Sequence, residues 1–167
     1  MGLITRIQQK FARIYYPWRI RKQAALCGNN LYVGGKSYVT KNTYIGDSVN
    51  FNGMSISGNG RVDIGSFFHS GQGCQIITSF HNYEGNFIPY DKSYIDKPVN
   101  IGDCVWIGNN VIILGGATIG EGAIIQAGSV VCKDIPAYSI AGGHPAVMFK
   151  MRDVAHYKEL KKLKKYN

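Results

Sequence analysis

A six-residue repeat of aliphatic side chains constrains the fold of this chain more than any other feature. One unbroken register places an aliphatic residue at every sixth position, namely Ile101, Ile107, Ile113, Ile119, Ile125 and Val131. Two residues before each stands a small or β-branched residue: Val99, Val105, Val111, Ala117, Ala123 and Ser129. The same spacing occurs earlier at Val33, Val39, Ile45 and Phe51, and more loosely at Ile64, Ser70 and Ile76.

The period of six predicts short β-strands, because six is a multiple of the strand period of two and not of the helical period of 3.6. Three short sides joined by turns would close a coil of about 18 residues, and stacked coils would bury their aliphatic residues against one another. Glycine supplies 21 of the 167 residues, which suits tight corners. We expect positive backbone φ angles at the corner residues Gly46, Gly65, Asn109, Asn110, Gly115 and Gly116.

The repeat, together with the segments Lys133–Pro136 and Gly142–Pro145, resembles the hexapeptide-repeat acyltransferases. That family includes galactoside, maltose, serine and xenobiotic acetyltransferases, and the resemblance covers about residues 31–150. It implies an all-β fold, a left-handed parallel β-helix. It also implies a homotrimer with active sites between subunits, and acetyl-CoA as the acyl donor.

We expect three segments along the chain. Residues 1–28 would form an N-terminal basic amphipathic helix, residues 29–149 the β-helix with an inserted loop at 78–100, and residues 150–167 a short basic C-terminal helix. The first helix should stop at Pro17, and Leu160 and Leu163 should dock the last one on the body. Apolar residues fall at helical spacing near the N-terminus: Leu3, Ile4, Ile7, Phe11, Ile14, Tyr15 and Trp18. This pattern predicts that the helix either caps the first coil or contacts an anionic membrane, and the sequence does not decide between the two roles.

The net charge of +9 is concentrated at the two ends of the chain. Residues 1–46 carry eight basic residues and no acidic one, residues 47–149 carry four basic and eight acidic, and residues 150–167 carry seven basic and two acidic. With no recognition motif in the sequence, this distribution argues against a nucleic-acid partner.

The four cysteines form no C-x-x-C pair, so we expect no metal site and interpret them as small buried hydrophobic residues. No apolar run is long enough to span a membrane, and the basic residues near the N-terminus argue against a signal peptide. We expect a cytoplasmic protein that could also bind peripherally at the inner face of the membrane.

The repeat fails between Thr78 and Asn100, and solenoids carry functional loops at such interruptions. His81 lies at the start of this insertion, where the resemblance puts the catalytic histidine of the family. Histidine titrates near neutrality and can remove the proton of an attacking hydroxyl as a general base. Glu84 is a candidate to orient the imidazole, and a backbone carbonyl would serve as well.

The resemblance also assigns residues to the two substrates. Asn50 would contact the acceptor. Trp106, at an outward position before Ile107, would line the cleft for acetyl-CoA and the acceptor, the alternative being a contact in the trimer interface. Small residues along the pantetheine arm and basic residues near the nucleotide phosphates complete the donor site: Ala127, Gly142, Lys133 and Lys150.

These features together predict an acetyl-CoA-dependent O-acetyltransferase acting on a hydroxyl of a sugar or of a bacterial surface polysaccharide, of capsule, O-antigen or lipopolysaccharide type. The acceptor would be a glycan or a nucleotide-linked or lipid-linked sugar, attacked directly without a covalent enzyme intermediate. Two alternatives remain, an N-acetyltransferase of an amino sugar or nucleotide sugar and a non-catalytic trimeric β-helix scaffold.

Overall fold

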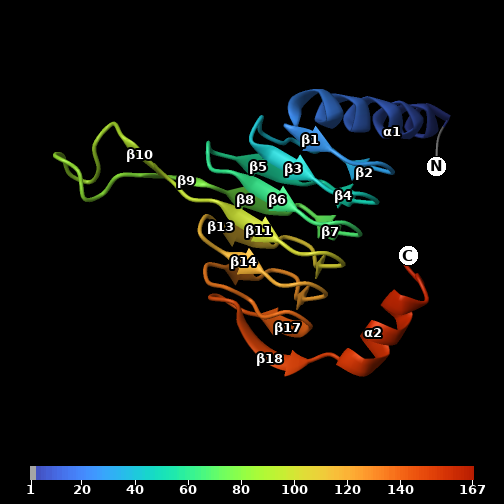
Figure 1. The fold of residues 1–167 in the computed structure, drawn as a ribbon. Coiled ribbons are helices and arrows are strands. Elements are labelled where there is room, and N and C mark those ends of the chain that lie inside the picture. Colours follow the sequence, from blue (N-terminus) through green and yellow to red (C-terminus); the bar gives the residue numbers. More distant parts are fainter. Residues whose placement is uncertain (1–2) are drawn as a thin grey trace.

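The computed structural model describes residues 3–167, with side chains from residue 13 onward. Its body is a stack of coils with helix α1 (Leu3–Gln23) across one end and helix α2 (Val154–Lys162) beside the other (Figure 1). No helix within the described residues is long and apolar enough to cross a membrane.

The strands of the coils form three sheets, in which the neighbours along each stack are parallel. Sheet A contains β1 (Leu26–Cys27), β3 (Thr43–Ile45), β6 (Val62–Ile64), β11 (Val99–Ile101) and β14 (Thr118–Ile119). Sheet B contains β2 (Tyr32–Gly35), β4 (Asn50–Asn52), β7 (His69–Gln72), β12 (Trp106–Ile107), β15 (Ile124–Ile125), β17 (Ser139–Gly142) and β18 (Val147–Met151). Sheet C contains β5 (Ser55–Ser57), β8 (Gln75–Ile77), β13 (Ile112–Leu114) and β16 (Val130–Val131).

The chain visits the sheets in turn, so this is the predicted parallel β-helix. Strand β18, at one edge of sheet B, runs antiparallel to its neighbour β17. The coil region is slightly longer than the range 29–149 expected from the sequence. It begins at β1, which pairs with β3, and ends with β18 at Met151.

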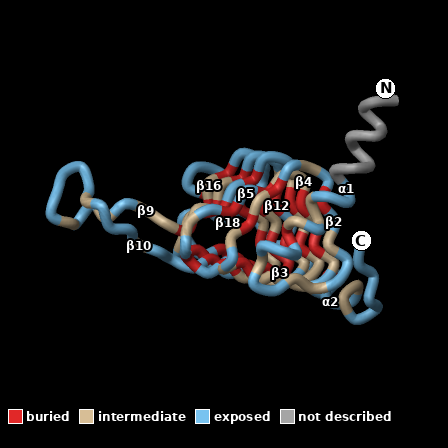
Figure 2. The backbone as a smooth tube through the Cα atoms, turned by 90° about the horizontal axis from the view of Figure 1, so that it is seen from above, coloured by how far each residue is buried: buried red, intermediate tan, exposed pale blue. Residues whose placement is uncertain are grey.

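The six-residue repeat forms the core of the β-helix (Figure 2). Every aliphatic residue from Ile101 to Val131 in the main register is buried, and so is each small or β-branched residue two positions earlier. Equivalent residues of successive coils pair in register, as Ile107 does with Ile125. Since each fully buried aliphatic side chain contributes roughly 1.5–3 kcal/mol, the stacked rows supply the main stabilising term.

The corners differ from the expectation in one respect. Asn110 and Gly116 have the predicted positive φ angles, of 55° and 99°. The other four corner residues, Asn109, Gly115, Gly46 and Gly65, do not have them. At Gly46 and Gly65 the neighbouring coil comes too close for a side chain. A Cβ on Gly46 would lie 2.7 Å from the Ser66 nitrogen, and one on Gly65 would lie 2.6 Å from the Asp103 nitrogen. Glycine is therefore required there by contact between coils.

Helix α1 continues through Pro17, contrary to the expectation that it would stop there. Ile20, beyond the proline, is buried in the core, and Tyr16 and Ala24 pack against the same cluster. This packing on the first coil offsets the hydrogen bond that proline removes. The earlier apolar residues Leu3, Ile4, Ile7 and Phe11 lie outside the residues whose side chains the structure describes.

Helix α2 packs against the corner between sheets A and B. Tyr157, which is only 7% exposed, anchors the helix. Leu160 is half-buried and Leu163 is exposed, so the expected pair of docking leucines is wrong. A tyrosine docks here because Gly122 has a φ of +67° and leaves room for the ring, which lies 2.9 Å from where a Cβ would stand.

The predicted insertion forms an arm that projects from the stack (Figures 1 and 2). It contains the antiparallel strands β9 (Ser79–His81) and β10 (Tyr94–Asp96), which pair His81 with Tyr94 and Phe80 with Ile95. The Ser79 hydroxyl donates to the Asp96 carboxylate across the base of the arm. The arm therefore has a regular base and an exposed loop, which lies within residues 82–93.

Candidate functional site

A groove with a volume of about 840 Å³ lies between sheet B and helix α2. Its floor includes Asn50, His69 and Trp106, and its opposite wall includes Tyr157, Lys161 and Tyr166. The remaining lining residues are Asn30, Tyr32, Ser48, Val49, Phe67, Phe68, Cys104, Val105, Arg152, Leu160, Lys165 and Asn167. This volume is within the usual range of small-molecule sites.

Strand alternation places the floor residues on the outside of the β-helix. Ser70 and Ile107 face the core, so the preceding residues, His69 and Trp106, face outward. Asn50 aligns with His69 in the next coil, and His69 aligns with Trp106 in the one after. The side chain of Trp106 is 53% exposed, which agrees with the outward position predicted for it.

Helix α2 is held against the groove by a small polar cluster. Lys161 Nζ lies 2.5 Å from Glu121 Oε1, and the Tyr157 hydroxyl donates to the same oxygen at 3.1 Å. Burial raises the pKa of Tyr157, and the neighbouring Cys104 and Glu121 act in the same direction. The hydrogen bond to Glu121 raises the pKa of Lys161.

The end of the chain completes this wall. The Tyr166 ring stacks on the Phe67 ring with a centroid distance of 3.9 Å and an angle of 11° between planes. Arg152 Nη1 donates to the Gly122 carbonyl at 2.9 Å, just before α2 begins. The groove is thus bounded by aromatic and basic side chains from the last part of the sequence.

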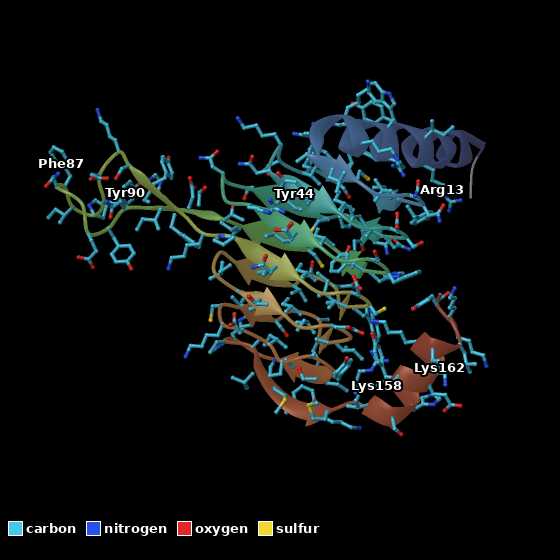
Figure 3. The ribbon with its side chains drawn as sticks, in the orientation of Figure 1. Arg13, Tyr44, Phe87, Tyr90, Lys158 and Lys162 are labelled. Carbon is cyan, nitrogen blue, oxygen red and sulfur yellow. The ribbon has the colours of Figure 1, made fainter. Side chains whose placement is uncertain are left out.

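His81 stands on the arm and is exposed. Its ring stacks on the Tyr90 ring at 3.9 Å with 13° between planes, and Tyr94 packs against it at 4.7 Å (Figure 3 labels Tyr90 on the arm). Within the described residues, neither ring nitrogen makes a hydrogen bond. The Glu84 carboxylate forms no hydrogen bond or ion pair with His81 there either, although the Glu84 backbone N–H donates to Asn82 Oδ1 at 3.2 Å. Two aromatic rings therefore hold the imidazole.

One copy of the chain does not bring His81 to the groove. The arm and helix α2 lie at opposite sides of the β-helix in both views (Figures 1 and 2). Asn50 and Trp106 both line the groove, whereas His81 and Glu84 lie on the arm, away from it.

The residues assigned to the acyl donor are spread over two corners and one strand. Ala127 and Gly142 end neighbouring coils at the corner between sheets B and C, and nothing lies within 4 Å of a Cβ built on Gly128. Lys133 follows β16 and Lys150 lies in β18; both are exposed and form no ion pair within the described chain. A Cβ on Gly142, in contrast, would lie 2.5 Å from Gln126 Oε1, so the open part of this corner is at Gly128.

The cysteines differ from the uniform burial expected of them. Cys74 is buried and Cys27 and Cys104 are intermediate, but Cys132 is exposed because it lies on the turn after β16, outside the core register. All of them are free thiols. Among the described residues there is no cluster of three or more side chains that could hold a metal ion.

Sequence reasoning missed His69, Tyr90 and Tyr94 as site residues. A signal for His69 was present, since it precedes the buried Ser70 as Trp106 precedes the buried Ile107. The repeat is less regular around His69, so its equivalence to Trp106 could not be recognised from the sequence. No periodic signal marks the two tyrosines, because they belong to the arm.

Part of the chain is similar in sequence to known transferases. Residues 98–133 match the sequence family described as bacterial transferase hexapeptide (six repeats). The protein named "Putative acetyltransferase SAV2555" from Staphylococcus aureus is 43% identical over 77 residues, which are 46% of this chain and 35% of the relative. The chain thus spans about a third of the length of the first curated relatives it matches.

Solved structures agree over a larger part of the molecule. A maltose O-acetyltransferase from Clostridium difficile 630 superposes with a TM-score of 0.72 at 29% identity, covering 89% of this chain and 82% of that one. A galactoside acetyltransferase in complex with coenzyme A gives a TM-score of 0.74 at 27% identity, covering 92% and 82%. Residues 98–133 are thus similar to the hexapeptide-repeat transferases, and most of the chain has the fold of the maltose and galactoside acetyltransferases.

Proposed function

We propose that this protein is an acetyl-CoA-dependent O-acetyltransferase that acts on a hydroxyl of a sugar or of a bacterial surface polysaccharide, of capsule, O-antigen or lipopolysaccharide type. The observation that carries the proposal is an exposed histidine, His81, at the exit of a coil of this β-helix. Support comes from the maltose and galactoside acetyltransferases, whose fold extends over most of this chain.

The chemistry needs one base and no protein nucleophile. The acceptor hydroxyl oxygen attacks the thioester carbonyl carbon while the His81 imidazole takes the hydroxyl proton. The carbon–sulfur bond breaks, and the resulting imidazolium returns the proton to the departing thiolate. The products are the acetyl ester and free coenzyme A. The stacking of His81 on Tyr90 and its tilted contact with Tyr94 support this role, because a fixed ring needs less reorganisation before attack.

We assign the acyl donor to the open corner that carries Ala127 and Gly142. Small residues let a pantetheine arm approach the stacked backbones, and the ammonium groups of Lys133 and Lys150 would attract its phosphates. Trp106 would lie between donor and acceptor. The coenzyme A bound in the galactoside acetyltransferase structure supports a donor of this kind.

We propose that the active unit is a homotrimer, with the arm of one copy delivering His81 to the groove of its neighbour. The arm exposes a large apolar tip that a single copy leaves uncovered, with Ile88 98% exposed and Phe87 70% exposed (Figure 3). Exposed apolar clusters of this kind mark interaction sites. The separation of His81 from the groove within one copy supports the same arrangement.

We propose a cytoplasmic location with peripheral contact to the inner face of the membrane through helix α1. Ile14 and Trp18 are exposed on its outer side, and Arg13, Arg21 and Lys22 lie close to them in the helix. Apolar and cationic groups together suit an anionic lipid surface. The opposite side of the helix caps the first coil, so both roles expected from the sequence are compatible.

Radiolabelled acetyl-CoA incubated with a panel of glycosides and polysaccharides tests the activity. Wild-type protein should label an acceptor at an alkali-labile ester. His81→Ala should lose about 10²–10⁴-fold in kcat, the usual contribution of a general base. A His81→Ala protein with full activity would overturn the assignment, and label in an alkali-stable amide would indicate N-acetylation instead.

A further inference from the structure

His69 lies between Asn50 and Trp106 in the row of outward side chains on sheet B. Its strand pairs with β4 on one side, opposite Asn50, and with β12 on the other, opposite Trp106. Neighbouring strands lie about 4.8 Å apart, so these three side chains are close enough to touch one ligand. The half-buried ring of His69 lines the groove.

Asn52 determines which nitrogen of His69 carries the ring proton. The amide nitrogen Nδ2 of Asn52 donates to the Ser70 carbonyl at 2.9 Å and also lies 3.4 Å from His69 Nε2. An amide NH₂ group can only donate, so Nε2 accepts. We therefore assign the proton to Nδ1, whose N–H makes no hydrogen bond to any described residue.

Asn50 supplies the complementary group in the adjacent coil. Its side-chain oxygen Oδ1 is buried and has no hydrogen-bond partner among the described residues. An unpaired polar group is costly to bury, which favours a ligand that pairs it. Neighbouring coils thus offer one unpaired donor and one unpaired acceptor, beside the exposed ring of Trp106.

We propose that His69 is a binding residue for the acceptor sugar, donating from Nδ1–H to one ring hydroxyl while an adjacent hydroxyl donates to Asn50 Oδ1. The ligand class is therefore a sugar ring with two neighbouring free hydroxyls, packed against Trp106. The inference rests on the proposed function, and it assigns His69 a part in acceptor specificity and not in proton transfer.

Steady-state acetyl transfer to methyl hexosides tests the role, with variants that separate size from hydrogen bonding. His69→Leu should raise the acceptor KM about two- to tenfold, the value of one neutral hydrogen bond, and leave the acetyl-CoA KM unchanged. His69→Gln keeps a donor and should recover most of the loss. His156→Leu, an exposed histidine on α2 outside the groove, is the matched control.

Monodeoxy derivatives of the best methyl hexoside identify the hydroxyl. One deoxy sugar should raise the wild-type acceptor KM by the same factor as His69→Leu and should cause no further loss in the His69→Leu protein, as expected of two groups that contact each other. Additive losses for every deoxy sugar, or an unchanged acceptor KM in His69→Leu, would overturn the role of His69 alone. Wild-type protein that transfers acetyl to no glycoside would remove the proposed function as well.

Discussion

At the residue scale, the environment of His81 is aromatic. The sequence offered Glu84 as one candidate partner and a backbone carbonyl as another, and the described ring contacts of the imidazole are with Tyr90 and Tyr94. A stacked ring keeps its plane while both nitrogens stay free for the acceptor and for solvent. This differs from the hydrogen-bonded orientation that histidine bases commonly have.

Two replacements of Tyr90 distinguish the contribution of its ring to catalysis from that of its hydroxyl. Tyr90→Ala should lower kcat about two- to tenfold with little change in either KM, because aromatic pairs contribute about 0.5–1.5 kcal/mol. Tyr90→Phe should keep wild-type kcat. The measurement is kcat and both KM values for all three proteins. Equal losses in Tyr90→Phe and Tyr90→Ala would show that the hydroxyl, and not stacking, matters.

The core register of the repeat can be tested with two neighbouring residues, one facing the core and one facing solvent. Ile119 is fully buried and Thr118, its neighbour in β14, is exposed. Ile119→Ala should lower the free energy of unfolding by about 2–5 kcal/mol, whereas Thr118→Ala should change it by less than about 0.5 kcal/mol. Denaturant unfolding at one fixed protein concentration compares them. Similar losses at both positions would contradict the proposed core register.

At the element scale, helix α2 is anchored by a tyrosine that must stay neutral. Because the pKa of Tyr157 is raised above its ordinary value near 10, its contribution to stability is complete below about pH 10 and is lost as the pH rises further. Tyr157→Phe, which cannot ionise, should be about 0.5–1.5 kcal/mol less stable at pH 8. That difference should shrink above pH 10 in urea unfolding. A difference that grows with pH would contradict the sign.

Helix α1 gives a prediction about membranes. Trp18 is 58% exposed on a helix whose last turn carries Arg21 and Lys22. Wild-type protein should sediment with vesicles containing phosphatidylserine and not with phosphatidylcholine alone, and added salt should weaken the binding. Trp18→Ala should reduce it several-fold. Leu163→Ala, which removes an exposed apolar residue elsewhere, should not, and an equal effect of both variants would count against α1.

Some elements of the fold could be predicted from the sequence and others could not. Residues such as Ile107 and Ile113 could be assigned to the core because every coil repeats the same environment. The pairing of Phe80 with Ile95 in the arm follows no period, and depends on contacts between residues distant in the chain. The continuation of α1 past Pro17 depends on the packing of Ile20 in the core. Local helix propensity does not include such tertiary contacts, so the sequence could not predict it.

At the scale of the whole molecule, the proposed site is divided between copies. His81 is carried on the arm, whereas Asn50, His69 and Trp106 belong to the groove on the other side of the β-helix (Figures 1 and 2). A cyclic trimer repeats one contact three times, so each arm can meet one groove. The sequence of one chain could not predict that these residues lie close together, because they would meet only when the copies assemble.

Complementation between two inactive variants tests this division most directly. His81→Ala and Trp106→Ala proteins, denatured together in equal amounts and refolded into mixed trimers, would be assayed for acetyl transfer beside each variant alone. A site divided between copies should restore about a quarter of wild-type activity, since that fraction of sites combines an intact arm with an intact neighbouring groove. Mixed trimers as inactive as the separate variants would contradict a site shared between copies.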